Sequence, residues 1–176
     1  MGAEPLTFER IEEILTGNMK LELTPEVKER IQRCRDYLDR KIETQSEPLY
    51  CITTGFGSWC NKNIAPDELC TLQENLGKSH GCSVGDEVSP VIGRLMMLLK
   101  AHALSLGHSG VQVLTVPRIL DFFNNDVLPN VNDRGSLGAS GDLAQLANLF
   151  LSLTGEGEVY DRGEERAAMR DLATIA

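Results

Sequence analysis

The chain has 176 residues, 41% hydrophobic and 24% charged, a composition typical of one globular domain and not of a disordered, collagenous or purely coiled-coil chain. With 17 Lys and Arg against 26 Asp and Glu, the net charge of −9 leaves no basic surface for phosphate, so we expect neither nucleic acid nor membrane partners. No apolar run is long enough to span a membrane and the N-terminus lacks a signal-peptide pattern, which predicts a cytoplasmic protein.

Apolar residues recur at helical spacing along most of the chain, so we expect a mainly α-helical fold. The predicted helices cover residues 7–15, 24–44, 66–76, 89–106, 116–124 and 142–153. Several ends carry helix signals: Thr7 as an N-cap, Pro25 after Thr24, and Gly17 and Gly107 just past a C-terminus. The last predicted helix is so rich in leucine that we expect it to be buried.

Three stretches interrupt this helical pattern. Residues 46–65 contain close glycines, β-branched residues and aromatics, which indicate an extended segment followed by a loop. A second break is expected over residues 77–85, and residues 155–163 indicate a turn or short hairpin. A final helix is expected to begin at Glu164, with no capping signal before the last residue.

The cysteines and histidines show no metal-site spacing. The five cysteines form no CxxC pair, so we expect reduced and mostly buried thiols rather than disulfides or zinc ligands. The three histidines form no HExxH or His-x-His pattern, and we interpret His102 and His108 as structural. No metal is predicted.

Residues 135–142 form a glycine-rich run that admits several interpretations. Backbone N–H groups ahead of a helix can hold phosphate, although no clear strand precedes the run and no Lys follows it. Alternatively, a very tight bend at small residues lets the Gly141 amide nitrogen attack the Ala139 carbonyl. Loss of water from that ring and from Ser140 then leaves a methylidene-imidazolone, an electrophile. A plain turn with Asp142 as N-cap fits the same residues, and spacing alone does not decide.

Several segments together resemble the aromatic amino-acid ammonia-lyases and aminomutases. The family's signature around its prosthetic group is similar to RGSLGASGDLAQLANLFLSLTGEGEV, and its tyrosine loop is similar to LYCITTGFGSWCNKNI. Its substrate-selecting segment is similar to ENLGKSHGCSVG, and the helix and turn after it to RLMMLLKAHALSLGHSGV. These segments occur in the family's order along nearly the whole chain. The resemblance implies the helical, fumarase/aspartase-like fold, with irregular active-site loops and little β structure.

The resemblance also implies catalytic roles. Ala139, Ser140 and Gly141 match the residues that form the methylidene-imidazolone autocatalytically, without an external cofactor, and Asp142 matches the acid implicated in forming it. Tyr50 matches the loop tyrosine that handles the substrate's β-proton. An ordinary phenol with a pKa of about 10 needs a lowered pKa or direct hydrogen-bonding reach for that task.

The resemblance further implies the substrate. Ser79 and His80 match the pair found in histidine ammonia-lyases, and Gly57 lies in the loop expected to close on the ligand, so these residues are predicted to bind substrate. The predicted reaction is non-oxidative elimination of ammonia from L-histidine to trans-urocanate. Thr53, more usual in phenylalanine and tyrosine lyases, keeps a lyase or aminomutase for those amino acids as an alternative. A non-catalytic lyase fragment or interaction module is the alternative from another class.

Two residues and the length depart from the family's pattern. Cys51 stands where glycine commonly follows the loop tyrosine, and Gln145 stands where proline is usual, which predicts a less rigid first helical turn. The family's enzymes are much longer and assemble as homotetramers. We therefore interpret residues 1–176 as one N-terminal segment, ending before the central helical bundle and inactive on its own.

Overall fold

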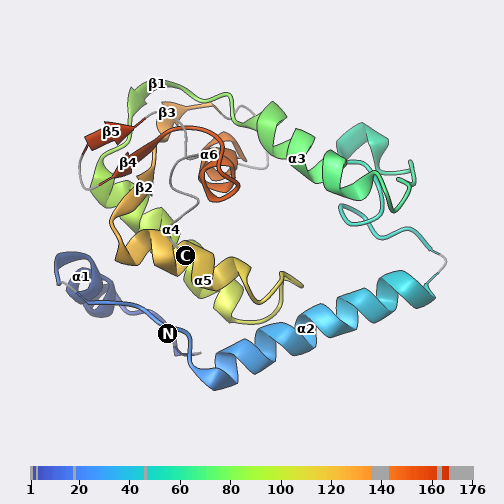
Figure 1. Cartoon of the computed structure of the whole chain (residues 1–176), viewed down its shortest axis with the longest axis horizontal. Helices are drawn as coiled ribbons and strands as arrows, with labels where there is room; N and C mark the ends of the chain where they lie inside the picture. Colours follow the sequence, from blue (N-terminus) through green and yellow to red (C-terminus); the bar gives the residue numbers. More distant parts are fainter. Residues whose placement is uncertain are drawn as a thin grey trace.

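The fold is given by a computed structural model, which describes residues 2, 4–17, 19–45, 47–135, 143–161 and 164–166 (Figure 1). Its helices are α1 (Phe8–Thr16), α2 (Pro25–Thr44), α3 (Leu69–His80), α4 (Pro90–Ser105), α5 (Thr115–Asn124) and α6 (Leu143–Leu153), with one 3₁₀ turn, η1 (Gly57–Trp59). Its strands are β1 (Val84–Glu87), β2 (Val127–Pro129), β3 (Asn132–Arg134), β4 (Val159–Asp161) and β5 (Glu164–Arg166). The mainly helical fold is confirmed, and no described helix is both long and apolar enough to cross a membrane.

The hydrophobic core surrounds α4 and α5, which pack against each other at the centre of the molecule (Figure 1). The side chains that these two helices bury most completely are Met97, Leu98, Ala101, Val116, Ile119 and Phe123. α1 and the first turns of α2 add Ile14, Val27 and Ile31 to the same core. Removing this apolar surface from water is the main favourable contribution to folding.

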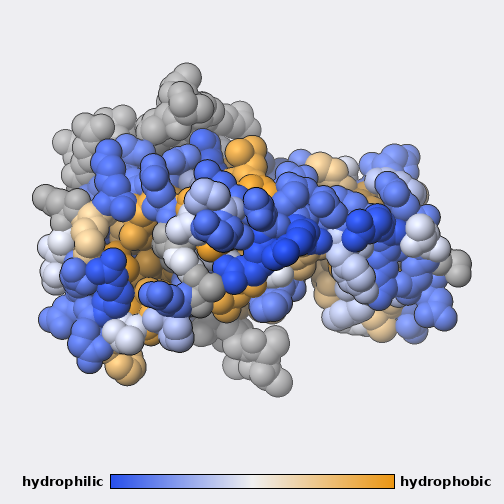
Figure 2. All heavy atoms as spheres, turned by 90° about the horizontal axis from the view of Figure 1, so that it is seen from below, coloured by the Kyte–Doolittle hydropathy of each residue, from blue (hydrophilic) through white to orange (hydrophobic). Residues whose placement is uncertain are grey.

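α2 leaves the core after its first turns and runs along the edge of the molecule towards the loop that precedes α3 (Figure 1). Its outer face is polar, and Arg35 donates to Asp39 one turn further on, with the Nε and Oδ2 atoms 3.0 Å apart. Viewed from below relative to Figure 1, the surface is mostly hydrophilic, with smaller hydrophobic patches between the hydrophilic areas (Figure 2).

Two small antiparallel sheets connect segments that are distant in the sequence. β1 pairs with β3, where Val84 lies opposite Arg134, and β2, β4 and β5 form a second sheet in that order. By pairing β1 with β3, the first sheet holds the segment that follows α3 against the segment that ends at Gly135.

Many predicted helix ends are confirmed. Thr7 caps α1 by accepting a hydrogen bond from the Arg10 backbone N–H at 3.3 Å, and Gly17 follows its last residue. α2 has the predicted bounds, although Thr24 makes no side-chain cap. Gly107 has φ +71° just past α4, the left-handed conformation for which glycine is favoured.

The predicted break at residues 77–85 is wrong in its first part, because α3 continues through His80. Gly77 is buried inside this helix, and an added Cβ there would lie 2.5 Å from the Phe150 ring on α6. Close packing of the two helices thus offsets the low helix propensity of glycine. The pair Ser79–His80 consequently lies on the last turn of a helix, not in a loop.

Other expectations are corrected as well. Glu164 begins strand β5 instead of a helix, because this segment completes the predicted hairpin by pairing with β4. α6 is not wholly buried: Leu143, Leu146 and Phe150 are each more than a third exposed. The thiols are free as predicted but not mostly buried, since Cys34 and Cys51 are half-buried and the exposed ones are Cys60, Cys70 and Cys82.

Candidate functional site

A cavity of about 780 Å³ lies where the loop before α3, α3 itself and α6 meet. It is lined by Tyr50, Cys51, Phe56, Gly57, Ser58, Gln73, Leu76, Gly77, His80, Leu143, Ala147 and Phe150. Three residues predicted from sequence, Tyr50, Gly57 and His80, are thus brought to one cavity from a loop and a helix. This volume is in the range of sites that enclose small molecules.

The loop that carries Tyr50 is braced by its own threonines. The Thr53 hydroxyl accepts a hydrogen bond from the Leu49 N–H at 2.9 Å. Thr54 is almost completely buried, with an exposed fraction of 1%. Thr54 also pairs with Asn63 in an isolated β-bridge, which closes the base of the loop. The extended segment expected over residues 46–65 is therefore reduced, in the described residues 47–65, to this bridge, and the remainder is loop, turn and the 3₁₀ turn η1.

Tyr50 lies at the edge of the cavity with 60% of its surface exposed. The Gly57 backbone N–H donates a hydrogen bond to the Tyr50 hydroxyl oxygen, with nitrogen and oxygen 3.4 Å apart. Gly57 has φ +55°, which explains why glycine serves at this position. The phenol and a backbone donor are therefore held together at the mouth of the cavity.

Cys51, next to Tyr50, also adopts the left-handed conformation, with φ +63°. This conformation brings Cβ too close to the carbonyl oxygen for most side chains, which is why glycine is favoured there. The cysteine noted as a departure from the family's pattern is thus a locally strained residue on the cavity wall.

His80 is oriented by the last turn of α3. Its Nδ1 lies 3.0 Å from the Leu76 carbonyl oxygen and 3.0 Å from the Ser79 hydroxyl, which itself donates to the same carbonyl. With the ring hydrogen on Nδ1, His80 donates to the Leu76 carbonyl, which only accepts, and Nε2 of the neutral ring is an acceptor. With the hydrogen on Nε2, Nδ1 accepts from the Ser79 hydroxyl instead. Ser79 is not among the described residues that line the cavity, and it contacts His80 instead.

α6 contributes one face to the cavity, with Leu143, Ala147 and Phe150 at helical spacing. Leu143 directly follows Asp142 in the sequence. The predicted residues Ala139, Ser140, Gly141 and Asp142 themselves lie outside the described residues. What the structure does describe is the chain on both sides of residues 136–142.

The two ends of that segment touch. A Cβ added to Gly135, on the near side, would lie 2.7 Å from the Cβ of Ala144 on α6 and 2.8 Å from the Cα of Ser83. Only glycine permits this approach. The described chain therefore stops at Gly135 and resumes at Leu143 at nearly the same place in the molecule, with seven residues between them.

Sequence reasoning missed several lining residues, among them Phe56, Gln73 and Phe150. Gln73 lies seven residues before His80 on α3, with Leu76 and Gly77 between them, so helical spacing from His80 was a usable signal. Phe56 and Phe150 had no comparable signal, since aromatic residues are most often part of a core.

The cavity offers polar groups but, among its described lining residues, no carboxylate, ammonium or guanidinium group. Its described lining contains a phenol, an imidazole, an amide and a hydroxyl, beside apolar walls from Phe56, Leu76 and Phe150, and no Lys, Arg, Asp or Glu. Across the described part of the chain, no group of His, Cys, Asp and Glu side chains is arranged to hold a metal ion. The arrangement suits a small ligand that has a flat ring and a few hydrogen-bonding groups.

Comparison with known proteins gives consistent matches. Residues 6–176 match the family model described as aromatic amino acid lyase. Histidine ammonia-lyase of Staphylococcus aureus (strain bovine RF122 / ET3-1) is 40% identical over 166 residues, covering 94% of this chain and 33% of that protein. The chain thus spans about a third of the length of the curated relatives it matches.

Solved structures of the same kind share the fold. Histidine ammonia-lyase from Trypanosoma cruzi is 31% identical with a TM-score of 0.83, over 97% of this chain and 32% of that one. Ergothionase from Treponema denticola, an ergothioneine-degrading enzyme in complex with desmethyl-ergothioneine sulfonic acid, is 25% identical with a TM-score of 0.89, over 96% and 33%.

Proposed function

The chain belongs to the aromatic amino acid lyase family, and from this premise we propose that its cavity serves the elimination of ammonia from L-histidine to give trans-urocanate. The observation that carries this choice of substrate is His80, on the cavity wall, with Nδ1 engaged by the Leu76 carbonyl. With the ring hydrogen on Nδ1, the Nε2 acceptor matches an imidazole N–H of a histidine substrate, whereas a phenylalanine ring offers no such donor. A tyrosine phenol is also a donor, so the product assay below separates L-tyrosine from L-histidine.

We propose that Ala139, Ser140 and Gly141 form a methylidene-imidazolone in this protein. A bond forms between the Gly141 nitrogen and the Ala139 carbonyl carbon, and the carbonyl oxygen leaves as water. The Ser140 hydroxyl and α-hydrogen leave as a second water. Once formed, the group supplies an electrophile for the substrate's amino group.

The residues around this segment fit such a group. Ring closure needs a very tight bend, and the contact of Gly135 with Ala144 and Ser83 holds the two ends of the segment together. Leu143, which follows Asp142, lines the cavity, so the segment joins the chain at the cavity wall. The role of Asp142 in forming the ring stays a prediction.

Tyr50 is proposed to take the proton from the substrate's β-carbon. Its hydroxyl is at the cavity edge and accepts a hydrogen bond from the Gly57 N–H. A backbone donor at this position stabilises the deprotonated phenolate, which is the form of Tyr50 that can accept the β-proton and become a neutral phenol.

The substrate carboxylate requires a partner beyond the described lining residues, since these include no Lys or Arg. We therefore expect the isolated 176 residues to be inactive. The homotetramer, the cytoplasmic location and the single-segment organisation implied by the sequence stay predictions.

The test uses the complete protein with L-histidine, L-tyrosine and L-phenylalanine in turn, and follows the ultraviolet absorbance of urocanate, coumarate and cinnamate. We expect urocanate. Coumarate or cinnamate alone would assign the alternative lyase, and a β-amino acid, detected by chromatography of the products, would assign an aminomutase. Thr53, which keeps these alternatives open, is not among the described lining residues and its hydroxyl accepts from the Leu49 N–H, so the product assay decides between them.

A further inference from the structure

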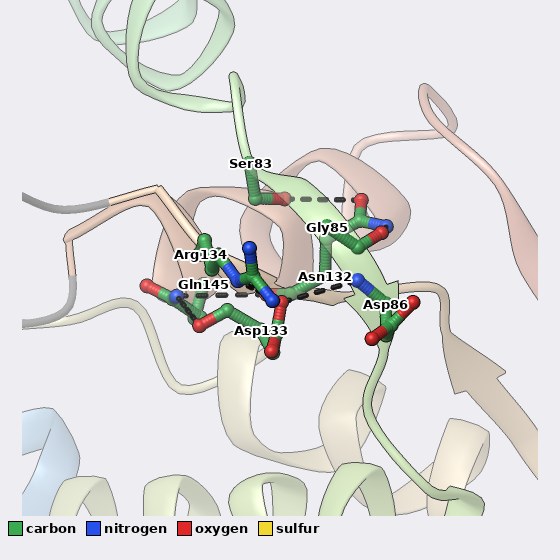
Figure 3. A network of polar contacts seen from close by, with 7 residues as sticks. All are labelled: Ser83, Gly85, Asp86, Asn132, Asp133, Arg134 and Gln145. Carbon is green, nitrogen blue, oxygen red and sulfur yellow. Dashed lines mark hydrogen bonds and ion pairs between the residues drawn. The ribbon is translucent and has the colours of Figure 1, made fainter.

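Gln145 lies in the first turn of α6, three residues after Asp142, and reaches back across residues 136–142. Its Nε2 lies 3.3 Å from the Asp133 carbonyl oxygen and 3.5 Å from the Asn132 carbonyl oxygen, both on β3 (Figure 3). The side chain thus connects the helix that follows the segment to the strand that precedes it.

The strand end of this connection is itself held in place. The Asn132 amide donates to the Gly85 carbonyl at 3.2 Å, and the Ser83 hydroxyl donates to the Asn132 Oδ1 at 3.4 Å (Figure 3). The Asp86 backbone N–H donates to an Asp133 carboxylate oxygen at 3.1 Å. On the helix side, Asn148 of α6 donates to the Ser83 hydroxyl. Strand β3 is therefore anchored to β1 and, through Ser83, to Asn148 further along α6, whereas Gln145 bonds the first turn of α6 directly to the β3 backbone.

The orientation of the Gln145 amide follows from its partners. Two carbonyl oxygens accept hydrogen bonds only from the NH₂ group, so Oε1 faces away from them. Oε1 is buried and has no hydrogen-bond partner among the described residues. A buried acceptor without a partner costs free energy, so the side chain contributes little net stability even though it bridges two elements.

We propose that Gln145 is a positioning residue for ring formation at Ala139, Ser140 and Gly141. By linking α6 to β3, it limits the separation of the two stems while the Gly141 nitrogen approaches the Ala139 carbonyl. A displacement of about 1 Å at a reacting centre can lower a rate by as much as about 100-fold, so a weak restraint on the stems has a large kinetic effect. This inference rests on the proposed function and adds to it a residue that no motif assigns.

Proline at position 145 restrains the same stem differently, through the backbone of the first turn of α6 and not through a link to β3. The backbone N–H of the third helical residue has no partner within the helix, so proline removes no helical hydrogen bond there. Its ring fixes φ near the helical value and stiffens the first turn. The glutamine therefore does not leave this turn loose, as its sequence position suggested; it restrains the turn through its side chain.

The experiment follows ring formation in the complete protein by intact mass, as the loss of two waters with time after synthesis, together with unfolding in urea. Gln145→Met keeps the length of the side chain and removes the donor. Gln145→Pro replaces the side-chain restraint by a backbone one. Gln32→Met is the matched control, since Gln32 on α2 donates to Asp36 on the same helix, far from the segment.

We expect Gln145→Met to form the ring about tenfold more slowly with an unchanged urea midpoint, Gln145→Pro to recover most of the rate, and Gln32→Met to equal wild type. Ring formation at the wild-type rate in Gln145→Met overturns the inference, as does a rate loss that only parallels a loss of stability. A wild-type protein that never loses two waters overturns the proposed function instead.

Discussion

Gly77 of α3 lies so close to the ring of Phe150 on α6 that a Cβ at position 77 would be 2.5 Å from two ring carbons. Both residues line the cavity, and His80 follows Gly77 by three residues on the same helix. This contact therefore sets the separation between the imidazole and α6, and with it the width of the proposed substrate site.

Gly77→Ala is expected to destabilise the protein by about 1–3 kcal/mol, because the added methyl group forces apart two packed helices. Gly93→Ala on α4 is the matched control: it is also a buried helical glycine, but its added Cβ would meet only the Pro129 carbonyl oxygen, at 3.9 Å. We expect it to stabilise by about 0.5–1 kcal/mol, since alanine has the higher helix propensity. Urea unfolding measures both, and changes of the same sign would contradict the packing described for Gly77.

Cys51→Gly is expected to be more stable than Cys51→Ala by about 1 kcal/mol, because only glycine adopts φ +63° without strain. At Cys34, within α2, the order should reverse by about the same amount, because alanine favours a helix. Thermal or urea unfolding of the four variants gives the comparison. The same order at both positions would refute the strain assigned to Cys51.

His80→Leu is expected to lower kcat/KM for L-histidine by about 10- to 100-fold, because the substrate imidazole loses its hydrogen-bond acceptor. Activity towards L-phenylalanine relative to L-histidine should rise. His108→Leu, at an exposed position in the turn after α4, serves as the control and should leave both activities unchanged. An unaltered preference for L-histidine in His80→Leu would remove His80 from substrate recognition.

Ser140→Ala is expected to abolish the loss of the second water and all lyase activity while the circular dichroism of the protein stays unchanged, since one hydroxyl is removed from a small residue. Intact mass checks the modification. Ser109→Ala, in the exposed turn after α4, should lose both waters as wild type does. Normal turnover by Ser140→Ala would end the proposed mechanism.

The sequence by itself determined features that depend on local interactions. The bounds of α1 and α2 followed from caps and apolar spacing, because helical hydrogen bonds join residues four apart and neighbouring side chains share a face. The turn after α6 followed from its glycines in the same way, although the second strand of the hairpin, β5, lies where a helix was expected. Tyr50, Gly57 and His80 were found because their motifs resemble a known family, and the structure brings them to one cavity.

Tertiary structure alone decided the rest, because the deciding contacts join residues far apart in the chain. From the sequence alone, Gly77 is expected to end the helix. In the structure, the ring of Phe150, 73 residues later in the chain, packs against Gly77 within the helix. Nothing in the sequence around Gln145 indicates that the carbonyls of β3 lie beside its amide. Packing between distant segments contributes more free energy than local propensity, so such contacts override the local pattern, and no periodicity in the sequence reveals them.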